Sequence, residues 1–194
     1  MRIITGSARG AKLETPEGNA TRPTAERVKE AIFSMIQFDI EGREALDLFA
    51  GSGQLGLEAL SRGAARATFT DTSREVTELI KRNAQHTHLF DRCRISCTDW
   101  KAFVKSSAGR EKFGVIFIDP PYGENIAYEV LSTVTKAGIV ADHAMLIVES
   151  GNPEPVVCAG LSLVRHARYG AVYITLLTKL PEAEIITDEP LKEE

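Results

Sequence analysis

From residue 44 to residue 150 the chain alternates short apolar runs with longer amphipathic segments, and this alternation restricts the fold more than any other feature. Short apolar runs are typical of buried strands, whereas apolar residues at three- and four-residue spacing indicate helices. Because consecutive parallel strands need a crossover, the repeated strand–helix pattern predicts a parallel sheet with helices on both faces. We expect strands at 44–49, 66–71, 92–97, 113–119 and 143–150, and helices at 54–62, 73–86, 99–107 and 125–137.

Further elements are expected on either side of this repeat. Thr24 suits an N-cap, and apolar residues then recur at helical spacing, so a helix is expected from there to about Phe38. Towards the other end, two runs at 161–168 and 171–179 flank the Tyr-Gly pair at 169–170. This pattern predicts a β-hairpin, and therefore an antiparallel edge to the sheet.

Composition restricts the class of protein and its compartment. With 194 residues, 43% of them hydrophobic, the chain can bury one sizeable core and is expected to form one domain with short additions. The longest apolar run, at 144–148, is far shorter than the ~20 residues that cross a bilayer, so no membrane segment is expected. Three cysteines without a C-x-x-C pair indicate neither a disulfide framework nor a zinc site, which favours a reducing cytoplasm.

Charge is distributed unevenly, although the formal net charge is only −4. Residues 180–194 carry a local charge of −5 and are expected to form a disordered acidic tail, which leaves the rest of the chain at +1. Residues 1–29 carry +3, with Arg2, Arg9 and Lys12 on a segment that predicts two short strands around a glycine-containing turn. Such a small excess also fits an ordinary solvated surface.

The strongest motif runs from Asp47 to Gly56, D-L-F-A-G-S-G-Q-L-G, where the first strand of the repeat turns into a helix. Glycines let the backbone approach a ligand closely, and a helix N-terminus offers unpaired N–H groups. Gly51, Gly53 and Gly56 also match the G-x-G-x-x-G spacing of dinucleotide sites, with Asp71 twenty residues after Gly51. Asp47, however, would repel a pyrophosphate and suits a cationic ligand, so both types of site stay open at this point.

Three acids, Asp47, Asp71 and Asp99, end three successive strands, and open parallel sheets bind ligands at this edge. The two oxygens of Asp71 can accept hydrogen bonds from ribose hydroxyls, and Asp99 can accept one from the amine of an adenine. Asp71 and Asp99 can equally cap the helices that follow them. Their shared position at the strand ends favours a role in binding.

A second motif, Asp119-Pro120-Pro121-Tyr122, follows the strand expected at 113–119. The prolines hold the backbone extended and remove its donors, which leaves carbonyl groups free to face a ligand. The Asp119 carboxylate and the Pro120 carbonyl can together accept both hydrogens of an exocyclic amine, while Tyr122 stacks on the ring that carries it. The alternative is a rigid turn with an exposed tyrosine.

With these motifs the sequence resembles class I S-adenosylmethionine-dependent methyltransferases. More closely it is similar to the RsmD-type family, which methylates N2 of a guanine in 16S ribosomal RNA. The resemblance covers residues 1–178 and includes R-I-I-T-G near the start, T-R-P-T at 21–24, the run at 47–64, D-P-P-Y and R-Y-G. It implies an α/β, Rossmann-like fold with a seven-stranded, mostly parallel sheet, an antiparallel terminal hairpin and a small N-terminal arm.

The resemblance also implies roles for individual residues. The loop from Asp47 to Gly53 would hold the methionine part of the cofactor, and Arg22 would pair with its carboxylate. The implied cofactor-binding residues are Arg22, Thr24, Asp47, Phe49, Ala50, Gly51, Gly53, Asp71, Asp99, Trp100 and Asp119; the implied catalytic residues are Asp119, Pro120 and Tyr122; and the implied RNA-binding residues are Arg2, Arg9, Lys12 and Arg22. Two positions differ from many relatives, which have Glu at Asp71 and Asp at Ala171.

These observations give a division into an RNA-facing arm at 1–22, a methyltransferase domain at 23–180 and an acidic tail at 181–194. We expect a cytoplasmic monomer without a metal, acting on small-subunit ribosomal RNA, either naked or within an assembling 30S subunit. Three alternatives stay open: an amino methyltransferase acting on adenine or cytosine of DNA or of another RNA, an NAD-dependent oxidoreductase, and a non-catalytic RNA-binding module.

Overall fold

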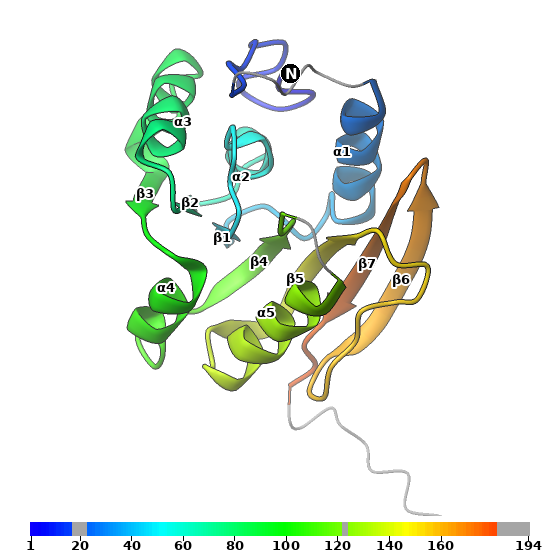
Figure 1. Ribbon diagram of the computed structural model, residues 1–194. Helices are drawn as coiled ribbons and strands as arrows, with labels where there is room; N and C mark the ends of the chain where they lie inside the picture. Colours follow the sequence, from blue (N-terminus) through cyan, green and yellow to red (C-terminus); the bar gives the residue numbers. More distant parts are fainter. Residues whose placement is uncertain (17–22, 122–123, 182–194) are drawn as a thin grey trace, which may run out of the picture.

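The computed structural model describes residues 1–16, 23–121 and 124–181. Seven strands form one sheet in the order β3-β2-β1-β4-β5-β7-β6 (Figure 1). The β5–β7 and β7–β6 pairs are antiparallel and the other pairs are parallel. The strands are β1 (Glu44–Asp47), β2 (Arg66–Asp71), β3 (Cys93–Cys97), β4 (Phe113–Ile118), β5 (Val140–Ser150), β6 (Ser162–Tyr169) and β7 (Val172–Thr178). The predicted fold class, including the terminal hairpin, is confirmed.

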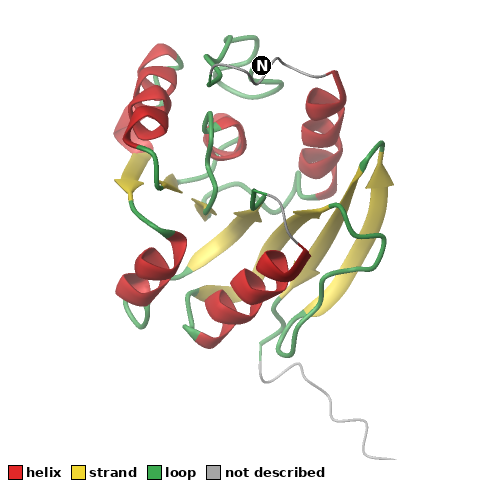
Figure 2. Cartoon of the chain, viewed as in Figure 1, coloured by secondary structure: helices red, strands yellow, loops and turns green. Residues whose placement is uncertain are grey.

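Helices cover both faces of the sheet (Figure 2). Those on one face are α1 (Pro23–Met35), α2 (Gln54–Ser61) and α3 (Arg74–His86); those on the other are α4 (Trp100–Ser107) and α5 (Glu124–Lys136); and a short 3-10 helix, η1 (Phe90–Arg92), precedes β3. Each helical layer buries its own apolar cluster against the sheet, one built around Phe33 and Phe117 and the other around Phe103 and Leu146. No helix in these described segments is long and apolar enough to cross a membrane.

Element boundaries differ from the expectations at several ends. Helix α1 ends at Met35 instead of near Phe38, because the buried apolar stripe stops at Ile36 and the Phe38 side chain is 91% exposed. Strand β1 ends at Asp47 rather than at residue 49, since the chain leaves the sheet there to form the glycine loop. At β1 the apolar residues still pack after the strand has ended, since Leu48 is buried in the core and Phe49 packs against the same cluster.

Residues 1–16 pack against α2 instead of forming two strands. One antiparallel bridge, between Arg2 and Lys12, joins the two sides of the loop, so the expectation of two short strands is wrong. Ile3 is fully buried in the cluster shared with α1 and α2. Gly6 has a φ of +88°, and a Cβ at this position would clash with the backbone carbonyl of Ser61. The N-terminal segment is therefore held by buried contacts that leave no room for a larger residue at position 6.

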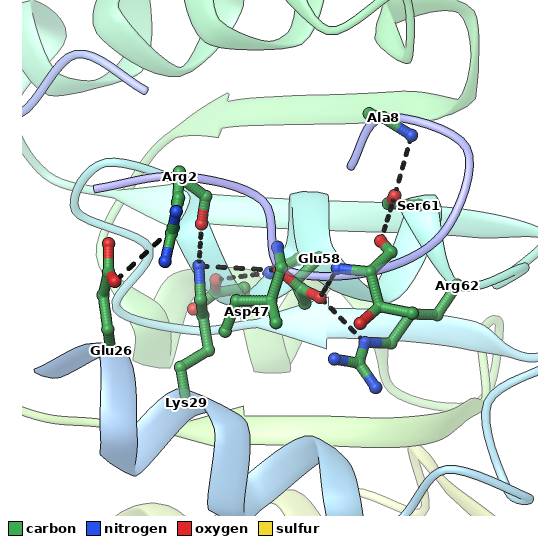
Figure 3. A network of polar contacts seen from close by, with 11 residues as sticks. Arg2, Ala8, Glu26, Lys29, Asp47, Glu58, Ser61 and Arg62 are labelled. Atoms are coloured by element: carbon green, nitrogen blue, oxygen red, sulfur yellow. Dashed lines mark hydrogen bonds and ion pairs between the residues drawn. The ribbon is translucent and has the colours of Figure 1, made fainter. Parts of the chain in front are cut away.

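The buried carboxylate of Glu58 on α2 joins three parts of the chain (Figure 3). Its oxygens accept hydrogen bonds from the backbone N–H groups of Ile4 and Thr5, at 2.7 and 3.0 Å. Arg62 donates to the same carboxylate at 2.8 Å, and the buried Lys29 ammonium of α1 lies 3.5 Å from it. Burial lowers the pKa of Lys29, and the negative charge of Glu58 acts in the opposite direction. Glu58 thus holds the N-terminal segment and α1 together.

Replacement of Glu58 by Ala is expected to lower the free energy of unfolding by about 3–5 kcal/mol, because it removes the counter-charge of the buried Lys29 ammonium, which keeps only the Arg2 carbonyl at 2.6 Å, and the acceptor of two partly buried backbone N–H groups. Urea denaturation followed by circular dichroism measures this change. Glu78→Ala, which breaks an exposed ion pair with Lys81 on α3, serves as the control and should leave the midpoint nearly unchanged. Equal effects of the two substitutions would contradict the assigned role of Glu58.

Candidate active site

Acidic residues from three adjacent strands, β2, β1 and β4, gather at one edge of the sheet. Asp47 on β1 is in register with Phe69 on β2 and Phe117 on β4. Asp71 and Asp119 therefore follow two residues further along the neighbouring strands, on either side of Asp47. Because the strands are parallel, their carboxyl ends lie together, as the sequence predicts for an open α/β sheet.

A pocket of about 870 Å³ opens at this edge. Seven of the predicted site residues line it, namely Phe49, Gly51, Asp71, Asp99, Trp100, Asp119 and Pro120. The pocket extends from the ends of β2 and β3 to the end of β5 and to Val172 at the start of β7. Phe49 and Trp100 contact each other with ring centroids 6.4 Å apart. The pocket thus combines an aromatic wall with several carboxylates.

The other predicted site residues lie elsewhere. Asp47, Ala50 and Gly53 belong to the glycine loop but do not contribute to the pocket wall. Arg2, Arg9 and Lys12 are exposed on the N-terminal segment, away from the residues that line the pocket. Arg22 and Tyr122 lie outside the described residues, and the side chain of Thr24, at the start of α1, is also not described. The roles predicted for these residues stay predictions.

The glycine loop has a specific backbone shape. Gly51 and Gly53 have φ values of +50° and +76°, in the left-handed region that other residues rarely adopt. Gly56 is helical, but a Cβ there would clash with the ring of Phe69 on β2. The Asp47 side chain is almost fully buried and accepts a hydrogen bond from the Gly56 N–H at 3.2 Å. The spacing of the glycines is therefore explained by two turn positions and one close helix–strand contact.

Asp71 and Asp99 each combine a hydrogen bond from a following backbone N–H with a position in the pocket wall. One oxygen of Asp71 accepts a hydrogen bond from the Ser73 N–H at 2.8 Å, although the N-cap of α3 is Ser73 itself. Asp99 is the N-cap of α4, and its Oδ1 accepts from the N–H of Lys101 at 2.8 Å. In each acid these bonds use Oδ1, so they leave Oδ2 available to a ligand. The capping alternative is therefore wrong for Asp71, because Ser73 caps α3, whereas Asp99 both caps α4 and lines the pocket.

The carboxylates share the pocket without a basic neighbour in its wall, as far as the described residues extend. Burial raises the pKa of Asp47 to about 7, with smaller increases from Asp119 and Asp71. Asp119 keeps an exposed surface in the open pocket, yet the protein atoms around it raise its pKa to about 6. Such a set of acids favours a positively charged ligand.

Glu149 was not predicted from the sequence, although it lines the same pocket. It lies near the carboxyl end of β5, and both burial and the charge of Asp119 raise its pKa, to about 8. The signal was available, because Glu149 ends the apolar run at 144–148 just as Asp71, Asp99 and Asp119 follow theirs. No group of three or more His, Cys, Asp or Glu side chains suited to a metal occurs among the residues the structure describes.

The strand order, the antiparallel terminal hairpin and the pocket at the carboxyl ends of the strands define the class I methyltransferase fold. Residues 1–178 match the family described as conserved hypothetical protein 95. The chain therefore belongs to this family, and the resemblance to RsmD-type methyltransferases is confirmed.

Relatives cover nearly the whole chain. The chain is 35% identical over 190 residues to the ribosomal RNA small subunit methyltransferase D of Escherichia coli, covering 97% of this chain and 94% of that one. It is 34% identical over 166 residues to the Haemophilus influenzae protein of the same name, covering 81% and 82%. The solved structure of the Escherichia coli protein yhhF has a TM-score of 0.83 and 35% identity, with 94% and 99% covered.

Asp47→Asn is expected to stabilise the ligand-free protein more at pH 8 than at pH 5. With a pKa of about 7, the folded protein keeps a proton that the unfolded chain releases near pH 4, so stability falls as pH rises through this interval. The full penalty at pH 8 has an upper limit on the order of 4 kcal/mol. Thermal unfolding at both pH values measures the effect.

Asp91→Asn, at an exposed acid of η1, is the matched control for this substitution and should not show the pH-dependent gain. If Asp47→Asn increased thermal stability equally at pH 5 and pH 8, the pKa of Asp47 would not be raised by burial.

Proposed function

We propose that this protein transfers a methyl group from S-adenosylmethionine to the exocyclic N2 of a guanine in 16S ribosomal RNA. The observation that carries the proposal is the position of Asp119 and Pro120 in a pocket lined by acids. Support comes from relatives at about 35% identity that are named ribosomal RNA small subunit methyltransferase D.

The residues of the pocket fit this cofactor. S-adenosylmethionine carries a sulfonium and an ammonium group, and a pocket wall of acids without a basic residue suits both charges. Asp71 would accept hydrogen bonds from the ribose hydroxyls, and Asp99 with the Trp100 backbone would hold the adenine. The loop from Asp47 to Gly53 would hold the methionine part, with Arg22 on its carboxylate and Thr24 close by. When bound, the cofactor supplies an electrophilic methyl group.

The chain's own residues would orient the nucleophile. The Asp119 carboxylate and the Pro120 carbonyl accept the two N2 hydrogens, so that the nitrogen lone pair is directed at the methyl carbon, while Tyr122 stacks on the base. Methyl transfer would form the N–C bond as the S–C bond breaks, and Asp119 would accept the proton that the nitrogen then loses. Orientation supplies most of the acceleration, because the amine mainly lacks a correctly directed lone pair.

The substrate RNA would contact the N-terminal segment. Arg2, Arg9 and Lys12 are exposed there, and Arg22 belongs to the same arm. We keep as part of the proposal the division into an RNA-facing arm at 1–22, a methyltransferase domain at 23–180 and an acidic tail at 181–194. Because the chain is close to neutral outside its tail, we propose that ribosomal proteins of an assembling 30S subunit contribute to docking, with the enzyme acting as a cytoplasmic monomer.

Methyl transfer from labelled S-adenosylmethionine to 30S subunits lacking their own modifications tests the proposal. N2-methylguanosine is expected after digestion of the RNA, and equal activity on naked 16S RNA would remove the role of ribosomal proteins. Incorporation only into DNA or another RNA would favour the alternative amino methyltransferases. Binding of NAD without methyl transfer would favour an oxidoreductase, and RNA binding without methyl transfer would favour a binding module.

Asp119→Ala is expected to reduce methyl transfer by at least about a hundredfold, because the N2 hydrogens lose their charged acceptor and the lone pair is no longer oriented. Asp119→Asn should retain more activity than Asp119→Ala, since its carbonyl still accepts one hydrogen. Calorimetric titration with S-adenosylmethionine should show that affinity falls far less than methyl transfer in both variants. Full activity of Asp119→Ala would refute the mechanism.

A further inference from the structure

Glu149 is the acid of the pocket for which the proposed mechanism gives no role. Val148 on β5 is in register with Ile118 on β4, so Glu149 and Asp119 follow each other directly on neighbouring parallel strands. Both line the pocket, and the charge of Asp119 acts on Glu149. Its strand partner on the other side is Ile174 of β7, a buried apolar residue that offers no counter-charge.

The order of strands gives the order of groups along the pocket. Asp99 and Asp71 lie at the ends of β3 and β2, Asp119 follows β4 in the middle, and Glu149 lies on β5 at the opposite end. If Asp99 and Asp71 hold the adenosine half of the cofactor, as proposed above, the target amine at Asp119 lies beyond it, and Glu149 comes next. Glu149 is therefore placed against the target base rather than against the cofactor.

The bases that carry an exocyclic amine differ in the ring nitrogen beside it. In guanine the N2 amine lies between two ring nitrogens, N1–H, which is a hydrogen-bond donor, and N3, which is an acceptor. In adenine and cytosine, the corresponding ring nitrogen is an acceptor. An ionised carboxylate can only accept hydrogen bonds, so at this position it would bind guanine and repel the other two bases.

We infer that Glu149 accepts a hydrogen bond from N1–H of the target guanine and so makes the enzyme selective for guanine. This inference rests on the proposed function and adds Glu149 as the residue that distinguishes guanine from the other bases. Burial and Asp119 favour the neutral form of Glu149 in the ligand-free pocket. The positive charges of the bound cofactor favour the ionised form, in which both oxygens are acceptors. Asp119 then holds the N2 amine, and Glu149 accepts the hydrogen bond from the adjacent N1–H.

Replacing the target guanine by 2-aminopurine tests the inference. 2-Aminopurine keeps the amine at C2 but has an unprotonated N1, which is an acceptor. The substrate is a 30S subunit reconstituted around 16S RNA that carries this base at the methylated position. Wild-type kcat/KM should fall at least about a hundredfold relative to guanine, because a site built to accept a hydrogen bond would face a lone pair.

For Glu149→Gln, kcat/KM should be less than about tenfold lower with 2-aminopurine than with guanine, since the glutamine amide can turn to donate a hydrogen bond to the unprotonated N1. Its affinity for S-adenosylmethionine should stay within about threefold of wild type. Glu154→Gln, an exposed residue five positions further on, is the control and should show the full wild-type selectivity.

Equal selectivity of wild type and Glu149→Gln would overturn the inference, as would a large loss of cofactor affinity in Glu149→Gln with selectivity unchanged. The latter would place Glu149 against the cofactor's ammonium group. Failure of wild type to methylate guanine at all would instead refute the proposed function, so the two failures are distinguishable.

Discussion

The buried carboxylate of Glu58 is the interaction on which the arrangement of the site depends. Glu58 lies on the same short helix as Gly56, whose N–H fixes Asp47 behind the pocket. Through its bonds to the backbone of residues 4 and 5 and its ion pair with Lys29, it also sets the position of the N-terminal segment and of α1 relative to that helix. The glycine loop and the segment that carries the proposed RNA contacts therefore share one rigid support.

A buried ion pair of this kind is not the most stabilising solution available to a fold, because well-packed apolar residues often serve as well. Its advantage is directional. Two backbone N–H groups of the N-terminal segment, the ammonium of Lys29 on α1 and the guanidinium of Arg62 at the end of α2 converge on one carboxylate. An apolar contact would tolerate a shift of the N-terminal segment along α2, whereas these bonds do not.

Much of the fold could be predicted because its signals are local. The strand at 66–71 and the helix at 73–86 were expected from periodicity alone and lie within one residue of β2 and α3. The packing of Ile3 and Gly6 against α2 could not be predicted, since it depends on contacts with residues more than fifty positions away. Within the site, Asp71, Asp99 and Asp119 follow from the rule for strand ends. Glu149 obeys the same rule, but it was not predicted because it lies within a strand that continues to Ser150 instead of following the end of its strand.

The site is arranged so that folding and binding favour different charge states. In the ligand-free protein, burial disfavours the charge on Asp47, Asp119 and Glu149, and no basic side chain of the described pocket wall offsets it. A cationic ligand lowers these pKa values and favours the ionised acids, so its binding is coupled to the release of protons. Asp71 and Asp99 contribute in another way, because their hydrogen bonds from the backbone N–H groups of Ser73 and Lys101 restrain the side chains before a ligand arrives. Less conformational entropy is then lost on binding, and the reacting groups can be aligned without the acids having to reorganise.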